Sequence, residues 1–271
     1  METVVPEGYA EHAPPLDLAR YVLCFWTSLR PSGVETPAWS RRVLPDGCVD
    51  IVLGFGRDDD PASVGLTEAF GVGAMTKPLI VDGPGPRLYV GVRFRPGFAY
   101  AAFGIPAAEL TDERVELDVI GEGPSELADI EIQATDAGRV SATMELVRRR
   151  LLGSRIVPAV PRSVRAAVYR IVNARGNLRV ASVASEFGVT RQQLAKQFAT
   201  HVGVTPKMLA RISRTQAALA RADAARAAHP RQIDWSAIAF DLGYYDQPHF
   251  IDDFKALTGK TPGEWIRGGR L

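Results

Sequence analysis

IAFDLGYYDQPHF, at residues 238–250, has an earlier counterpart in VASEFGVTRQQL, at residues 183–194. Ala184 in the first copy matches Ala239 in the second at a shift of 55 residues. A Gly-x-Thr-Pro motif follows each copy, at residues 203–206 and 259–262, and here the shift is 56 residues, so the second copy has one additional turn residue. The chain therefore repeats one short unit, and such a repeat is best interpreted as a whole before its residues are considered one by one.

Each copy has the features of two helices joined by a tight turn. Gly188 and Gly243 stand where the chain leaves the first helix, because glycine accepts the left-handed backbone of that position. Thr190 and Asp246 follow, and both are suitable N-caps for a second helix. The sequence therefore predicts two helix-turn-helix units.

Helical periodicity predicts which face of each second helix is buried. The apolar positions are Leu194 and Phe198 in the first unit and Phe250 and Phe254 in the second. The first unit then exposes polar side chains that can pair with base edges in a major groove, since glutamine pairs with adenine and Arg or Lys with guanine. These exposed residues are Arg191, Gln192, Gln193 and Lys196.

With this ordered pair of units, residues 160 to 268 resemble the DNA-binding domain of the AraC/XylS family of transcriptional regulators. The segment 238–250, the Phe254-Lys255 pair and the motif at 259–262 carry the resemblance. The resemblance implies that a long helix, from Pro206 to about Ala225, joins the two units. It also implies an asymmetric DNA site that spans successive major grooves.

By the same resemblance, Gln192 and Lys196 read bases in the first unit, while Arg191 and Gln193 lie nearer the DNA backbone. The DNA-binding positions implied in the second unit are Tyr245, Gln247, His249 and Lys255, the last near a phosphate.

The second unit departs from the family pattern at Asp252 and Asp253, where polar or basic residues are frequent. A carboxylate repels phosphate unless it accepts a hydrogen bond from a cytosine amine. We therefore expect the first unit to supply more of the affinity for DNA.

Charge divides the chain of 271 residues near Pro158. Residues 1–157 hold 15 Lys and Arg against 23 Asp and Glu, a net −8, whereas residues 158–271 hold 17 against 8, a net +9. A basic half joined to an acidic half is typical of a protein that binds a polyanion, although a merely solvated basic surface is the alternative. The length predicts two domains, and the absence of a signal-peptide pattern predicts a cytoplasmic protein.

The first half of the chain contains short apolar runs separated by Gly and Pro, the pattern expected of short strands. Residues 88–94 alternate apolar and polar side chains, Pro96-Gly97 follows, and a small helix is expected at 98–103. The fold class predicted for the whole chain is α+β, with a β-rich, cupin-like barrel or sandwich before an all-α C-terminal domain.

The motifs PDGCVD at 45–50 and GVRFRPG at 91–97 resemble one class of N-terminal sensor module in the same family, which implies ligand sensing or dimerisation without naming a ligand. Arg93 and Arg95 are candidates for binding an anionic effector. The alternative places both on the solvent face of their strand.

A helical stretch follows Asp136, with one apolar stripe at Val140, Met144, Val147 and Leu151. The stripe packs either on its own domain or on a second copy of the chain. A proline-containing segment at 157–161 then predicts a linker. The predicted divisions are a sensor domain at 1–122, a helical segment and linker at 123–157, and the DNA-binding domain at 158–271.

An enzyme is the competing class, either as a cupin-like metalloenzyme or as a metal-independent relative. The histidines are His12, His201, His229 and His249, so the strands expected between residues 21 and 95 hold none for a metal. No phosphate-binding loop or nucleophile elbow is present, and Cys24 and Cys48 are expected to be buried thiols. We therefore predict no catalytic residue, no cofactor and no metal.

A non-specific nucleic-acid-binding protein is the remaining alternative. Expected partners are a double-stranded DNA operator and a small-molecule effector, with RNA polymerase and a second copy of the chain (a homodimer) as further candidates.

Overall fold

The computed structural model describes residues 8–30, 40–56, 65–82, 86–117, 127, 129–130, 133, 135–153, 159–228 and 233–267. The predicted domain boundaries at 122–123 and 157–158, and His229, lie outside these residues.

An antiparallel sheet of six strands forms the centre of the N-terminal half, in the order β1-β2-β7-β4-β5-β8. Its strands are β1 Tyr9–His12, β2 Val22–Leu29, β4 Val49–Phe55, β5 Leu66–Val72, β7 Leu88–Phe94 and β8 Arg114–Glu116. The two remaining strands, β3 Ser40–Val43 and β6 Leu79–Asp82, pair with each other in a separate two-stranded sheet.

The prediction of a closed barrel was wrong for the part of the chain that the structure describes. The main sheet ends at β1 on one side and β8 on the other. The strands β3 and β6 do not join these two edges, because each takes the other as its partner. The β-rich antiparallel character was predicted correctly, and the sheet is open.

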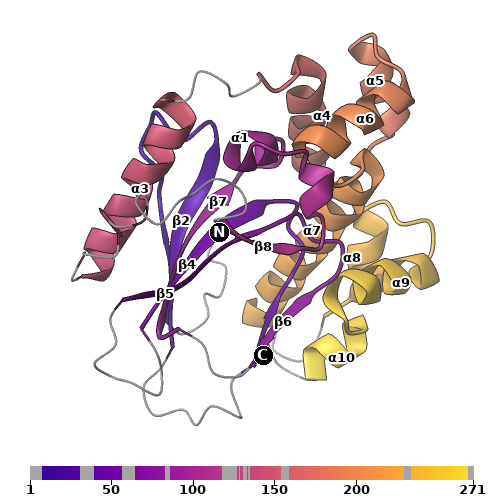
Figure 1. Ribbon diagram of the computed structural model, residues 1–271. Coiled ribbons are helices and arrows are strands. Elements are labelled where there is room, and N and C mark those ends of the chain that lie inside the picture. Colours follow the sequence, from indigo (N-terminus) through magenta and orange to yellow (C-terminus); the bar gives the residue numbers. More distant parts are fainter. Residues whose placement is uncertain are drawn as a thin grey trace.

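Strand β7 confirms the predicted alternation. Leu88, Val90, Val92 and Phe94 are at most 4% exposed. Helix α3, Asp136–Gly153, packs against β2 and β7 (Figure 1). Its residues Val140, Val147 and Leu151 are buried in the same core, so packing within the protomer accounts for the apolar stripe.

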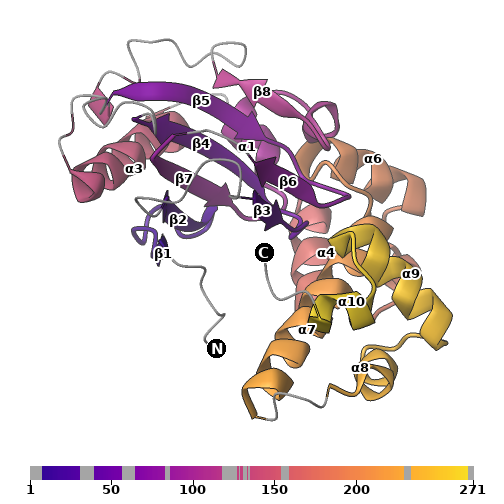
Figure 2. The ribbon, with the colours of Figure 1, turned by 90° about the horizontal axis from the view of Figure 1, so that it is seen from below.

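The C-terminal half is helical. Its elements are α4 Arg162–Asn173, α5 Val180–Glu186, α6 Arg191–His201, α7 Pro206–Ala228, α8 Trp235–Asp241, α9 Gln247–Thr258 and α10 Pro262–Arg267. The long helix α7 joins the two predicted units and runs slightly further than expected (Figure 2). Two short elements, α1 Ala99–Phe103 and the 3-10 helix η2 Ala107–Leu110, connect the sheet to α6.

The two halves are in direct contact. The Thr111 hydroxyl, after η2, donates to the carbonyl oxygen of Gly203 at 2.7 Å. On β3, Arg42 donates to the carbonyl oxygen of Thr258 at the end of α9, also at 2.7 Å. The side chain of Gln216, on α7, donates to the Pro45 carbonyl at 2.6 Å. The sheet domain therefore touches both helical units and the helix between them.

Within the described residues, no helix is both long and apolar enough to cross a membrane. Cys24 and Cys48 are each 6% exposed and form no disulfide, as predicted.

Candidate nucleic-acid interface

The first unit, α5 and α6, forms as its capping residues predict. Gly188 takes the turn with a φ of +64°. The Thr190 hydroxyl accepts from the Gln193 backbone N–H at 3.1 Å, and the Gln193 side-chain oxygen accepts from the Thr190 N–H at 2.8 Å. This reciprocal capping box fixes the residue at which α6 begins, and thereby which side chains occupy its first turn.

Helix α6 separates an apolar face from a polar one. Leu194 and Phe198 are at most 1% exposed. Arg191, Gln192 and Lys196 are exposed, as is Gln193, whose side chain caps the helix. The first turn therefore presents amide and cationic groups outward, while the opposite face anchors the helix.

The second unit, α8 and α9, repeats this arrangement with different capping chemistry. Gly243 takes the turn with a φ of +75°, and the Asp246 carboxylate accepts from the His249 backbone N–H at 2.9 Å. Phe250 and Phe254 are buried. The four predicted DNA-binding residues are exposed, with Tyr245 at 95%, beside Gln247, His249 and Lys255.

Helix α6 contacts α1 and η2, and α9 ends beside β3, but the predicted DNA-binding side chains of both helices are exposed (Figures 1 and 2). The arrangement leaves the outer faces of both second helices uncovered by the sheet domain.

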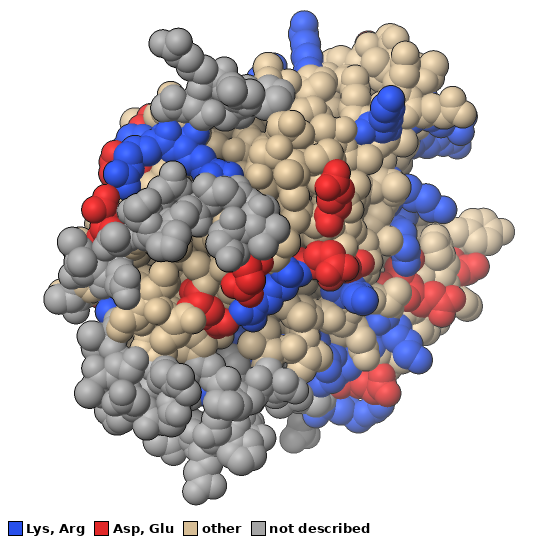
Figure 3. All heavy atoms as spheres, viewed as in Figure 1, with Lys and Arg blue, Asp and Glu red and all other residues tan. Residues whose placement is uncertain are grey.

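The segment from α4 to α6 and the segment from α8 to α10 differ strongly in charge. Residues 162–201 hold seven Arg and Lys against one Glu, a net +6, whereas residues 234–267 hold three against six Asp and Glu, a net −3. In Figure 3, the upper right of the molecule, around α5 and α6, is mostly tan with a few separate blue side chains, and blue and red spheres are mixed lower down, around α9. The basic residues of the C-terminal half therefore lie mainly before residue 234, outside the second unit.

Comparison with known proteins gives one matching domain model for each half of the chain. Residues 183–268 match the model of a family described as a helix-turn-helix domain, and residues 10–116 match a domain of unknown function. The C-terminal part of the chain is therefore a helix-turn-helix domain of the AraC type. Helix-turn-helix domains bind DNA.

Solved structures of ToxT from Vibrio cholerae show weaker similarity. The apo form from strain SCE256 is 14% identical, covering 90% of this chain and 97% of that one, with a TM-score of 0.41. A 1.65 Å structure is 12% identical, covering 90% and 98%, with a TM-score of 0.41. An unsaturated-fatty-acid-bound ToxT is 11% identical, covering 98% and 97%, with a TM-score of 0.39. No curated protein matches the chain significantly.

In the sheet domain, Arg93 is held by carboxylates. Its Nε lies 3.2 Å from a carboxylate oxygen of Asp46 and 3.2 Å from one of Asp50. Burial raises the pKa of Asp50, and the charge of Arg93 opposes that rise. Asp50 also accepts from the Trp26 indole N–H at 2.8 Å. The positive charge of Arg93 is thus balanced within the protein.

Arg95 is exposed, and its Nε donates to the carbonyl oxygen of Ala19 at 2.8 Å. Among the described residues, no group of three His, Cys, Asp or Glu side chains is placed to hold a metal ion.

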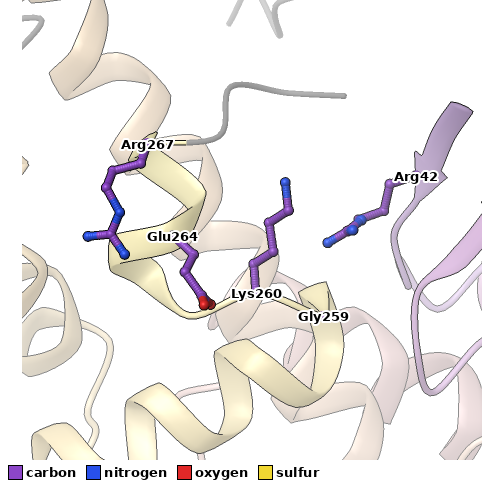
Figure 4. Close-up of a pocket in the computed structure, with 5 residues that line it drawn as sticks. All are labelled: Arg42, Gly259, Lys260, Glu264 and Arg267. Atoms are coloured by element: carbon purple, nitrogen blue, oxygen red, sulfur yellow. The ribbon is translucent and has the colours of Figure 1, made fainter. Parts of the chain in front are cut away.

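A surface hollow lies where the sheet domain meets the second unit (Figure 4). Arg42 extends into it from β3, opposite Lys260, Glu264 and Arg267 from the region of α10. The hollow sits beside the hydrogen bond from Arg42 to Thr258, so a change in the sheet domain at β3 would reach the end of α9 directly.

Sequence reasoning missed the role of Asp253. Asp252 is exposed, but the Asp253 side chain is 5% exposed and accepts from Nε of Arg211, on α7, at 2.7 Å. The signal was available, because position 253 falls on the same helical face as Phe250 and Leu257.

Proposed function

We propose that α6 and α9 read base edges of one asymmetric operator in successive major grooves. The observation that supports this most directly is the exposure of all the predicted DNA-binding side chains on two capped helices whose other faces are buried. A rigidly held helix with amides and cations in its first turn suits the major groove, which admits one helix.

The assigned roles differ along each helix. Gln192 and Lys196 read bases from α6, and Gln247 and His249 read bases from α9. Contacts with the DNA backbone are assigned to the remaining members of the set, Arg191, Gln193, Tyr245 and Lys255.

We further propose that the first unit supplies most of the affinity and the second selects among sites. Phosphate contacts dominate affinity, and residues 162–201, which include the first unit and α4, carry a net +6 against −3 for residues 234–267. Specificity then arises where α9 accepts some sequences and rejects others.

The sheet domain is proposed to modulate DNA binding, through an effector or through a second copy of the chain. The contacts of Thr111 with Gly203 and of Arg42 with Thr258 support this, because each ends beside one DNA-reading helix. A shift of the sheet domain would therefore bias the placement of both helices.

Selection from a library of random duplexes of about 30 base pairs, long enough for two half-sites one helical turn apart, tests the proposal. The full-length chain should enrich one sequence and prefer it to random duplex by about 10³-fold or more. Gln192→Ala and Gln247→Ala should relax the preference at two separate groups of positions. Enrichment of no sequence would favour the non-specific alternative.

A further inference from the structure

Helix α9 carries two neighbouring aspartates whose surroundings are opposite. Asp252 is exposed, whereas the Asp253 side chain is 5% exposed and turned toward the connecting helix α7. Arg211 Nε donates to Asp253 Oδ1 at 2.7 Å, and Nη2 of Arg214 lies 3.8 Å from Oδ2. A buried carboxylate flanked by two guanidinium groups on one neighbouring helix is a specific, directional contact.

The polar cluster around Asp253 extends to the start of α9. Nε2 of His249 lies 3.8 Å from Asp253 Oδ2. The Tyr244 ring lies 4.6 Å from the Arg214 guanidinium carbon and packs edge-on against the His249 ring, at 5.4 Å between centroids. Burial raises the pKa of Tyr244 to about 12, so its hydroxyl stays neutral. Through this cluster, Asp253 is linked to His249, one of the residues assigned to read bases.

The apolar contacts of α9 fix its orientation less sharply than the ion pair between Asp253 and Arg211 does. Phe250 and Phe254 bury the helix, but the hydrophobic effect has no preferred direction. The ion pair restricts both the rotation of α9 about its axis and its displacement along α7, because the atoms of Asp253 and Arg211 must meet at hydrogen-bond distance.

We propose that Asp253 is a positioning residue, which holds α9 on α7 in the orientation that turns Gln247 and His249 toward DNA. It makes no DNA contact of its own. The inference rests on the proposed function, and it replaces the expectation from the sequence that Asp253 repels phosphate. The two interpretations predict opposite effects when the carboxylate is removed.

The test compares three variants of the full-length chain. Asp253→Ala removes the contact, Asp253→Asn keeps an oxygen that accepts from Arg211, and Asp252→Ala removes the same charge from the exposed neighbour. Each variant is titrated with the duplex enriched by the native chain, and with the same duplex after its second half-site is scrambled.

Positioning predicts that Asp253→Ala weakens binding to the intact duplex by about tenfold or more, the loss expected for a charged hydrogen bond. Binding to the scrambled duplex should change by less than about twofold, because α9 no longer contributes there. Asp253→Asn should recover to within about threefold of the native chain, and Asp252→Ala should bind both duplexes as tightly as the native chain or more tightly. The proposal is overturned if Asp253→Ala behaves like Asp252→Ala, or if Asp253→Asn is as weak as Asp253→Ala.

Hydrogen exchange of the DNA-free chain is a second, independent test of whether Asp253 holds α9 in place. Amides of residues 247–258 should exchange about tenfold faster in Asp253→Ala than in Asp252→Ala, while those of residues 191–201 are unchanged. Equal acceleration in both segments would overturn the proposal, since it marks a general loss of stability. If the native chain enriched no duplex, the proposed function would fail, and the exchange measurement would still decide whether Asp253 holds α9.

Discussion

Gly188 and Gly243 occupy the same turn of the repeated unit, and their surroundings differ. Both have positive φ, +64° and +75°. A Cβ added at Gly188 would meet nothing within 4 Å, whereas one added at Gly243 would lie 2.5 Å from Oδ1 of Asn177, in the loop before α5. Replacement by alanine therefore separates the cost of the left-handed backbone from the cost of crowding between the two units.

Gly188→Ala should lower the free energy of unfolding by about 1 kcal/mol, the lower end of the penalty for an L-residue in this conformation. Gly243→Ala should carry the same penalty together with the displacement of Asn177. Moving that side chain from a favoured rotamer adds roughly 1 kcal/mol, for a total of about 2 kcal/mol.

Equilibrium urea unfolding of the full chain measures both values, with circular dichroism and tryptophan fluorescence recorded together to verify a single transition. In the double variant Asn177→Ala/Gly243→Ala, the crowding disappears, so this chain should lie only about 1 kcal/mol below Asn177→Ala alone. Equal losses for the two glycine variants, or no recovery in the double variant, would refute the reasoning.

Three further predictions concern single side chains. Lys196→Ala should weaken operator binding more than His249→Ala, and a larger loss from the histidine change in a titration would contradict the assignment of affinity to the first unit. Thr190→Ala should lower the free energy of unfolding by about 1 kcal/mol, because it removes the side-chain cap of α6, and urea unfolding would detect this. Burial lowers the pKa of His201, so the folded chain disfavours its protonated form. The contribution of neutral His201 to the free energy of unfolding is therefore fully present above the ordinary histidine pKa of about 6.5 and is lost as the pH drops below that value. A His201→Gln chain should lose less stability than the native chain between pH 7.5 and 5.5, and parallel urea curves would show it; an unchanged pH dependence would count against it.

The helical units could be predicted closely because their determinants are local. An N-cap such as Thr190 acts on amides three residues away, and the burial of Phe250 and Phe254 follows from the helical period. The same reasoning predicted strand β7, whose alternation depends only on the period of two.

Pairings between distant segments could not be predicted in this way. The choice of β6 as the partner of β3, which leaves the main sheet open, depends on residues far apart in the chain. The contact of Arg42 with Thr258 spans 216 positions, and no local pattern indicates it. Arg93 was assigned to an effector or to solvent, because the alternation of β7 shows its face but not the carboxylates of Asp46 and Asp50 opposite it.

The aspartates of α9 show how a local pattern is misread when charge is considered before position. Asp253 lies three residues after Phe250 and four before Leu257, so the helical period places it on the buried face, where a carboxylate requires cationic partners. Arg211 and Arg214 supply them from one face of α7. Since that charge is balanced inside the protein, Asp252 is the exposed carboxylate of α9. The expectation that α9 contributes less affinity than α6 therefore depends on Asp252 and on the neighbouring turn, and not on the pair of aspartates as a unit.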